Sequence, residues 1–405
     1  MSTLVRRLLA ALAVLTLALS AACSTDSAGS STSTTGGEIT VAQVTEPDTT
    51  DPLMTSSLAG YNLFYAVFDR LTGFDNDGKI QPGLAKSWTH NADFTVWDFT
   101  LQPGVKFHNG EPLKASDVAF SYNFVKKTPT SGNSFFVSVM KSAKVTSDST
   151  VQFTLNQAFS AWPAQTSAIS IVPEDVYTKL GTEGFAKAPV GTGPFTFVSW
   201  QRGVNYVVAK NPDYWGTKPT LDKVTFSLVA AEDARVNGVQ SGSLNVGLIP
   251  PNQVPTVEGS GTAAVATKAA NEVTFLGMNS TSGPLADARV RKALSLAIDR
   301  KAIVDNLLGG LGQLNAQLVA PSVTGFVEGF PEPTYDTAQA TALLQEAGYQ
   351  GEEITFEYAT DGRIPLSSEI AQALAAYWEK VGVKIKLVGA DQASHSLKVA
   401  GKKMK

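Results

Sequence analysis

Cysteine is nearly absent from this chain of 405 residues. Its one cysteine, Cys23, lies near the start, so the chain has no internal disulfide and a cysteine-based metal cluster is implausible. Histidine is also scarce, with only His90, His108 and His395. No second histidine lies at metal-ligand spacing from any of these, and a lone histidine is usually not a ligand. The sequence therefore predicts no metal site.

The short motifs that mark common catalytic sites are missing as well. The sequence has no HExxH, no GxSxG and no Walker loop, and no nucleophilic cysteine follows Cys23. Acidic residues could still act as a catalytic pair, but nothing marks such a pair by spacing. The formal net charge is −4 and 43% of the residues are hydrophobic, which favours neither nucleic-acid binding nor a disordered chain. We expect no enzyme, no cofactor and no nucleic-acid partner.

The first 23 residues have the pattern of a secretory signal. Arg6 and Arg7 precede an apolar run at 8–19 that is short for a membrane span. Small residues then lead to Cys23, as at a bacterial lipoprotein cleavage site, where the cysteine is lipidated and becomes the mature N-terminus. Ser20 stands where such sites usually have leucine. An ordinary signal peptide with an incidental cysteine is the alternative.

Residues 24–37 are rich in serine, threonine and glycine, a composition typical of a flexible tether. No later apolar run approaches the roughly 18 residues of a membrane helix. We therefore expect an exported protein that is anchored to the outer face of the cell membrane through a lipid on Cys23. About 368 residues remain from Glu38 onward, enough for two or three domains on the usual scale of roughly 100 to 200 residues each.

The stretch 188–216 predicts a turn, a hairpin and a second turn. Gly191 and Gly193 flank Thr192 ahead of Pro194, a composition that suits a backbone with positive φ. The alternating residues that follow, from Phe195, predict two paired strands with a turn at 201–203. By composition alone, such a glycine- and proline-punctuated hairpin is also consistent with a purely structural corner.

Four stretches, with their order and spacing, resemble the extracellular solute-binding proteins of the peptide, nickel and opine class, the family 5 type, which feed ABC importers. The resemblance covers roughly 38–395. The stretches that carry it are 78–88, 105–118, VGTGPF with NPDYWG within 188–216, and 287–300.

The resemblance implies an α/β fold of the two-lobed periplasmic-binding-protein type, with an extra small α+β domain inserted in the first lobe. It divides the chain into lobe I at 38–73 and 190–270, the inserted domain at 74–189, and lobe II at 271–405. Family members usually continue beyond this length. Lobe II is therefore expected to be incomplete at its C-terminal end, with the chain either a truncated product or a binder with half a site.

Hydrophobic periodicity predicts the individual elements. The apolar faces of the helices at 61–71 and 289–303 are expected to face the core, with Tyr61, Asn62 and Tyr65 off the first of these faces, and the strand at 95–101 is expected to be half-buried. Expected strands lie at 39–44, 95–101, 145–155 (a pair with a turn at 147–149), 224–228, 244–248, 275–279, 353–358 and 383–388. Expected helices lie at 61–71, from an N-cap at Ser116, from Pro173, and at 230–241, 289–303, 337–348 and 367–381.

Candidate ligand-binding residues lie where the resemblance places the cleft or where loops follow predicted strands. Arg363, in the loop of a predicted βαβ unit, is the best single candidate for a ligand carboxylate because a guanidinium fork matches that group. His108, Glu111 and Arg235 are expected to be structural instead. The candidates are Glu46, Asp48, Tyr61, Asn62, Tyr65, Gly193, Asn279 and Arg363.

The function that the resemblance implies is capture of oligopeptides, dipeptides or a similar polar solute outside the membrane. A monomer would close its lobes over the solute and deliver it to an ABC permease with its ATPase. Two alternatives stay open at this point. One is a surface lipoprotein or holdase without a transport role, and the other is a carrier of a nickel chelate or another non-peptide solute.

Overall fold

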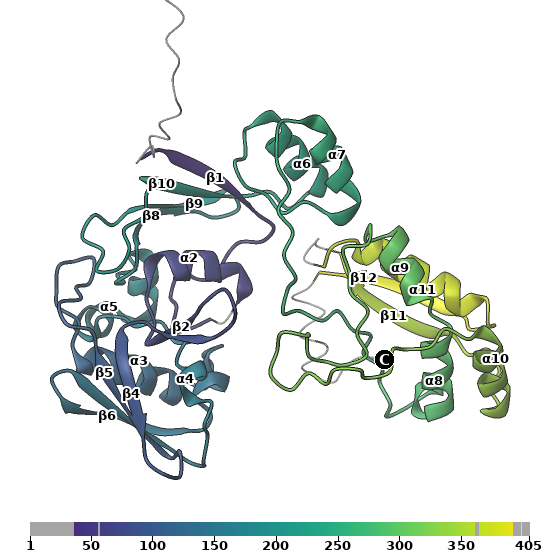
Figure 1. The fold of residues 1–405 in the computed structure, drawn as a ribbon, viewed down its shortest axis with the longest axis horizontal. Helices are drawn as coiled ribbons and strands as arrows, with labels where there is room; N and C mark the ends of the chain where they lie inside the picture. The colour runs from purple at the N-terminus through teal and green to yellow at the C-terminus, as the bar shows by residue number, and fades with distance from the viewer. Residues whose placement is uncertain (1–35, 56, 361–363, 392–397, 399–405) are drawn as a thin grey trace, which may run out of the picture. The chain divides into compact units, whose positions relative to one another are not determined.

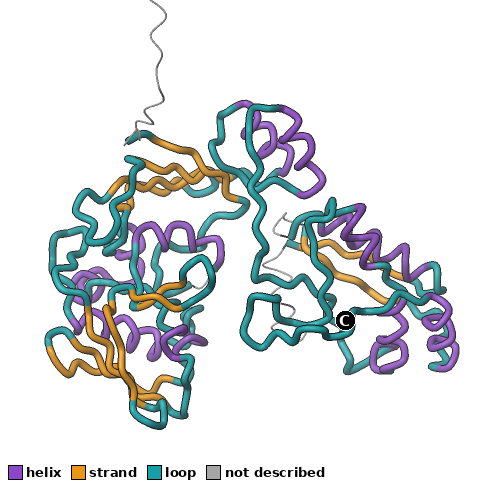
Figure 2. Tube along the Cα trace, in the orientation of Figure 1, coloured by secondary structure: helices purple, strands orange, loops and turns teal. Residues whose placement is uncertain are grey.

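The computed structural model describes residues 36–55, 57–360, 364–391 and 398 (Figures 1 and 2). It shows a mixed α/β fold with several separate sheets. None of the helices in these ranges is long and apolar enough to cross a membrane. Cys23 and Arg363 lie outside the described residues.

The first sheet joins the beginning of the chain to a segment more than 150 residues later. Its strand order is β1-β10-β9-β8, with β1 parallel to β10 and the other pairs antiparallel. The predicted strand at 244–248 is wrong, since only Val246 forms an isolated parallel bridge with Val41. The sheet's strands are β1 (Glu38–Gln43), β8 (Phe195–Gln201), β9 (Asn205–Lys210) and β10 (Lys223–Leu228).

Helix α2 (Tyr61–Val67) packs against β8 and β9 of this sheet (Figure 1). Its apolar face is buried as predicted, but the helix stops at Val67 instead of Leu71. Phe68 has an extended backbone, and the chain continues into β2 (Thr72–Phe74), which pairs with β3 (Ile80–Pro82). The residues after the helix therefore belong to a strand connection, which periodicity alone did not show.

The second sheet is antiparallel, with the order β4-β5-β7-β6. Buried and partly buried residues alternate along β5 and β7, as predicted for half-buried strands. Helix α3 packs against β6 and β7. The elements of this region are β4 (Ala85–His90), β5 (Val96–Leu101), α3 (Ala115–Lys127), β6 (Met140–Ser147), β7 (Thr150–Leu155), α4 (Trp162–Gln165) and α5 (Glu174–Lys187).

Asp117, rather than Ser116, organises the start of α3. The N-cap is Lys114, whose backbone N–H donates to the Asp117 carboxylate at 2.8 Å. The same carboxylate accepts from the backbone N–H of Glu174 at 2.9 Å, at the start of α5. The predicted N-cap at Ser116 is therefore wrong, because one buried acid serves the N-termini of two helices.

Helix α6 (Glu232–Ser241) follows β10 and precedes α7 (Val254–Ser260). Arg235 of α6 is 1% exposed, and it donates to the carbonyl oxygens of Leu248 at 3.0 Å, Val229 at 3.0 Å and Ala230 at 2.6 Å. A buried guanidinium needs such acceptors, since an unpaired buried charge is costly. The expected packing role of Arg235 is confirmed.

A second hydrophobic core lies among the later elements. Strands β11 and β12 are parallel and α11 packs on both, as the predicted βαβ unit requires. The predicted helix 289–303 is two helices, because Asp299 caps a new start by accepting from Ala302 N at 2.9 Å. No strand forms at 275–279. The elements are α8 (Ala288–Leu296), α9 (Arg300–Asn306), α10 (Thr337–Glu346), β11 (Ile354–Ala359), α11 (Ser367–Glu379) and β12 (Ile385–Ala390).

The buried hydrophobic residues form two clusters. One holds residues from Leu53 to Val224, including the fully buried Trp162 and Tyr122, and serves both large sheets. The other holds residues from Val290 to Val383, where Trp378 donates its indole N–H to the Leu294 carbonyl at 2.9 Å. The domain boundaries given above stay a prediction.

Candidate functional site

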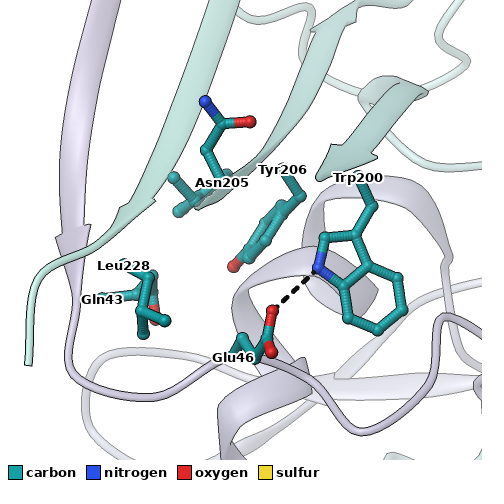
Figure 3. A pocket seen from close by; sticks show the side chains of 7 residues that line it. Gln43, Glu46, Trp200, Asn205, Tyr206 and Leu228 are labelled. Atoms are coloured by element: carbon teal, nitrogen blue, oxygen red, sulfur yellow. Dashed lines mark hydrogen bonds between the residues drawn. The ribbon is translucent and has the colours of Figure 1, made fainter. Parts of the chain in front are cut away.

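Glu46 lies in the loop that follows β1, beside the β8–β9 hairpin. Its carboxylate accepts hydrogen bonds from Trp200 Nε1 at 3.2 Å and from the backbone N–H of Gly203 at 2.9 Å. Figure 3 shows the carboxylate at the edge of a small pocket that Gln43 and Tyr206 also line. Glu46 therefore fastens the loop to the hairpin, and any ligand role would have to share this carboxylate.

Tyr206 is a deeply buried residue of the same pocket with a polar hydroxyl. Only 2% of it is exposed, and its hydroxyl has no hydrogen-bond partner among the described residues. Burial raises the pKa of this phenol, so Tyr206 stays neutral at physiological pH. The residue was not a candidate from the sequence, which placed it only in the second strand of the predicted hairpin.

Asp48 is exposed, and its backbone rather than its side chain meets the hairpin. The Asp48 carbonyl accepts from Arg202 Nη2 at 3.2 Å, while the carboxylate accepts from the N–H of Thr49 at 3.1 Å. The Arg202 guanidinium lies over the Trp200 ring at 4.1 Å. Glu46 and Asp48 therefore lie in one loop, and both contact the β8–β9 hairpin.

Tyr61, Asn62 and Tyr65 lie off the buried stripe of α2, as predicted. Tyr61 and Tyr65 stand one turn apart with their rings edge to face, and the ring centres are 5.9 Å apart. Tyr65 is 58% exposed, and Asn62 is exposed too. Beneath the Tyr65 ring lies Arg70, with its guanidinium carbon 3.8 Å from the ring centre. The structure therefore adds a cation to the tyrosines that the sequence selected.

Gly191 and Gly193 fit against the C-terminal end of α2. Neither has a positive φ, so the predicted backbone reason for these glycines is wrong. A Cβ on Gly193 would lie 2.6 Å from the Ala66 carbonyl oxygen, and one on Gly191 would overlap the Val67 carbonyl. Both positions require glycine because two backbone segments touch there. The role is close packing at the helix end, since the Gly193 carbonyl already accepts from Asn211 Nδ2 and lies 3.0 Å from His108 Nε2.

Asp69 joins the two turns of the 188–216 stretch. Its carboxylate accepts from Thr192 Oγ1 at 2.9 Å, Trp215 Nε1 at 2.8 Å and the Tyr214 hydroxyl at 3.1 Å. Burial raises the pKa of Asp69, and these three donors oppose that rise. The sequence analysis missed Asp69. The available signal was the pair of aromatic donors in NPDYWG, which need a buried acceptor.

His108 ties the second sheet's region to the same turn, as its expected structural role requires. Its Nδ1 lies 3.3 Å from the Gly191 N–H and its Nε2 lies 3.0 Å from the Gly193 carbonyl. The N–H can only donate and the carbonyl can only accept, so these contacts assign the neutral Nε2–H tautomer. Burial lowers the pKa of His108, and the bond to Gly193 opposes the effect.

Acidification is expected to weaken this junction. Because the pKa of His108 is lower in the folded state, the unfolded chain binds more protons once the pH falls below about 6.5. The contribution of His108 is fully present above that pH and is lost as the pH falls toward the folded value. Melting curves of wild type and His108→Gln from pH 8 to pH 4.5 should therefore converge on acidification. The exposed His90, changed to Gln, is the control, and parallel curves for His108→Gln would contradict the assignment.

The remaining candidates give less. Asn279 lies in a turn, where its side-chain oxygen accepts from the backbone N–H and hydroxyl of Thr281 at 3.1 and 2.7 Å. Arg363 and Cys23 fall outside the described residues, so their roles stay predictions. In the parts of the chain that the structure describes, no three His, Cys, Asp or Glu side chains are grouped to hold a metal ion.

Comparisons with known proteins support the family indicated by the sequence. The profile described as bacterial extracellular solute-binding proteins, family 5 middle, matches residues 79–404. The nickel-binding periplasmic protein of Escherichia coli (strain K12) is 28% identical over 348 residues, covering 81% of this chain and 66% of that protein. Protein XP55 of Streptomyces lividans is 31% identical over 370 residues, covering 87% and 66%. The chain thus spans about two thirds of the length of these relatives.

Solved structures agree on the fold. The ABC transporter-associated periplasmic binding protein DppA from Helicobacter pylori, in complex with the peptide STSA, superposes with a TM-score of 0.82 at 24% identity. The match covers 91% of this chain and 77% of that chain. The periplasmic-binding-protein fold is therefore confirmed, and a family of solute-binding proteins agrees with the expectation that the chain is not an enzyme. This chain belongs to the bacterial extracellular solute-binding proteins of family 5.

Proposed function

We propose that this chain is the solute-binding component of an ABC importer, which captures peptides or a similar polar solute outside the membrane and delivers them to a permease and its ATPase. The observation that carries the proposal is the family match over residues 79–404. The peptide in the complex of Helicobacter pylori DppA supports a peptide as the first solute to test. The nickel-binding relative supports a metal chelate as the second.

The binding residues we propose are Tyr61, Asn62 and Tyr65, which lie on α2 outside its buried face. Asp48, Glu46 and Gly193 serve the scaffold around them, because their polar groups bond to the β8–β9 hairpin or to neighbouring turns. Asn279 and Arg363 are kept as further candidates. A nickel ion would have to arrive within a chelate, since the described residues offer no cluster of metal ligands.

A thermal-shift experiment tests the proposal. The purified chain is melted alone, with a mixed pool of peptides of two to five residues, and with nickel–histidine. A ligand that binds only the folded state increases the free energy of unfolding by mass action, by about 2.7 kcal/mol at a ligand concentration of a hundred times Kd. The Tm rises as a result. We expect a cooperative transition that the peptide pool moves upward. A transition that neither solute moves would favour a surface lipoprotein or holdase without a transport role.

The proposed location is the outer face of the cell membrane, with the chain acting as a monomer held by a lipid on Cys23. The family of extracellular binding proteins supports export. The small residues before Cys23 support lipid attachment there. Fractionation of cells that express wild type and Cys23→Ala tests the anchor, since only the wild type should stay with the membranes.

A further inference from the structure

Arg70 is a buried cation whose donors are largely unused. It follows α2, just before β2, and only 6% of it is exposed. Among the described residues the one hydrogen bond of its side chain runs from Nη1 to the Phe68 carbonyl at 3.4 Å, and its Nε has no partner. Its guanidinium lies against the face of Tyr65 at 3.8 Å. A cation–π contact offsets part of the cost of burial, but it occupies none of the in-plane N–H groups.

No carboxylate of the described residues forms an ion pair with Arg70. The adjacent Asp69 directs its carboxylate to Thr192, Tyr214 and Trp215 instead. A buried charge is normally paired, because transfer from water to a protein interior costs several kcal/mol. Burial lowers the pKa of Arg70, yet an arginine keeps its proton at any physiological pH. The negative charge of Asp69 attracts Arg70 without direct contact, so the guanidinium donors stay without a carboxylate partner among the described residues.

The buried Arg235 and the partly buried Arg300 show how this chain satisfies a guanidinium that serves packing alone. Arg235 donates to three carbonyl oxygens between 2.6 and 3.0 Å. Arg300 donates to the Ser295 carbonyl and to the Ser295 hydroxyl, both at 2.9 Å. Arg70 has neither kind of arrangement. Packing is thus a sufficient reason for Arg235 and Arg300 and an insufficient one for Arg70.

Tyr65 is the boundary between Arg70 and solvent. Its ring is 58% exposed on α2 while the guanidinium against its face is buried. Tyr65 thus forms part of the cover between the guanidinium and solvent. Tyr61, edge to face with Tyr65, adds a second aromatic wall beside the same point. A flat anion could lie against these rings and meet the guanidinium in its plane.

We propose that Arg70 is the group that binds a carboxylate of the solute, with Tyr65 as part of the cover of the site. This inference rests on the proposed function, and it narrows the solute to one with a free carboxylate, such as the C-terminus of a peptide. A guanidinium presents two parallel N–H groups that match the two carboxylate oxygens. The bound carboxylate supplies the acceptor oxygens that the guanidinium lacks among the described residues.

The first experiment compares the peptide pool with the same pool amidated at the C-terminus, by the Tm shift that each produces. In wild type we expect a clear shift with free acids and a much smaller one with amides, equivalent to at least a tenfold loss in affinity. Arg70→Met should lose this discrimination. Arg202→Met is the matched control, because Arg202 is exposed at the hairpin and stacks on Trp200. Equal shifts for acids and amides in wild type, or discrimination that persists in Arg70→Met, would overturn the proposal.

The stability of the ligand-free variants gives a second readout with opposite signs. Methionine fills much of the space of arginine without a charge to desolvate, so Arg70→Met should raise the Tm of the ligand-free protein. Arg235→Met should lower it, because three buried carbonyls lose their donors. A fall in Tm for Arg70→Met, comparable to that for Arg235→Met, would show that Arg70 is a packing residue and would sink the inference.

Acetate separates a failure of this inference from a failure of the proposed function. If no peptide pool moves the transition, wild type and Arg70→Met are melted in sodium acetate and in sodium chloride of equal ionic strength. A carboxylate site at Arg70 predicts a Tm rise with acetate in wild type that Arg70→Met lacks. A Tm rise of this kind would support the anion site at Arg70 even though the peptide function had failed. If acetate gave no such rise, both the anion site and the peptide function would be rejected.

Discussion

Gly191→Ala is expected to cost the folded state about 3 kcal/mol or more, the upper range for a side chain forced into a filled space. The new Cβ would overlap the Val67 carbonyl oxygen and lie 2.7 Å from Phe68 Cδ1. Neither neighbour can move without cost. The Val67 carbonyl belongs to the backbone at the end of α2, and the Phe68 side chain is packed in the core at 1% exposure. Urea unfolding measures the loss as a lower midpoint at an unchanged m-value.

Gly73→Ala is the control for this prediction. Gly73 lies in β2, its φ is not positive, and a Cβ there would meet no atom within 4 Å. Its effect should stay within about 0.5 kcal/mol, as for most substitutions away from special positions. If Gly191→Ala were as mild as Gly73→Ala, the close approach between the VGTGPF turn and α2 would be wrong. Gly193→Ala should resemble Gly191→Ala, since its Cβ would lie 2.6 Å from the Ala66 carbonyl.

Asp69→Ala should be the second most damaging change, at about 2 to 3 kcal/mol, since hydrogen bonds to a charged group contribute about 1.5 to 3 kcal/mol. Three donors would lose their acceptor together, namely the hydroxyls of Thr192 and Tyr214 and the indole N–H of Trp215. An unsatisfied buried donor costs about 1 to 3 kcal/mol, which applies in full to Thr192 but not to the partly buried Tyr214 and Trp215, and the costs do not simply add. Because Trp215 reports on this site, the denaturation should be followed by tryptophan fluorescence and by circular dichroism.

Asp69→Asn serves as an intermediate variant for this prediction, and Asp213→Ala serves as its control. Asparagine keeps the shape and one acceptor oxygen, so its cost should fall between those of wild type and Asp69→Ala. Asp213 is exposed in the same NPDYWG turn, and its contact to Asn211 uses its backbone N–H, so its loss should be nearly neutral. If Asp69→Ala were no worse than Asp213→Ala, the hydrogen-bond network would have no role in joining the two turns.

Elements with local signals were predicted well. Alternation identified β5 and β7, and the turn residues placed the β8–β9 hairpin around Gly203, which has the φ of +74° that such a turn needs. The buried face of α2 followed from helical spacing, as did the inward residues of α8. These successes share a cause, since each pattern is fixed by neighbours within a few residues along the chain.

The failures have two causes, a capping residue that apolar periodicity does not register and strand pairing with a distant segment. The helix at 289–303 kept its apolar period through Asp299, so periodicity did not show that this carboxylate caps a second helix. The strand predicted at 244–248 has the right composition, but only one residue pairs with β1. Pairing is decided by which edge another strand leaves open, and a single sequence window holds no information about that edge.

The sequence by itself determined the family, through the order and spacing of four motifs, and with the family the fold and the class of solute-binding protein. It also selected the tyrosines of α2. Only the tertiary structure decided the role of the glycines of VGTGPF. A positive φ and a close backbone approach both require glycine, so the sequence does not distinguish the two reasons. The tertiary structure also decided that Asp69 and Arg70, adjacent in the chain, have opposite surroundings. Asp69 accepts from three donors far along the chain, whereas Arg70 forms no ion pair with a described acid. Such partners are set by packing rather than by neighbours in sequence.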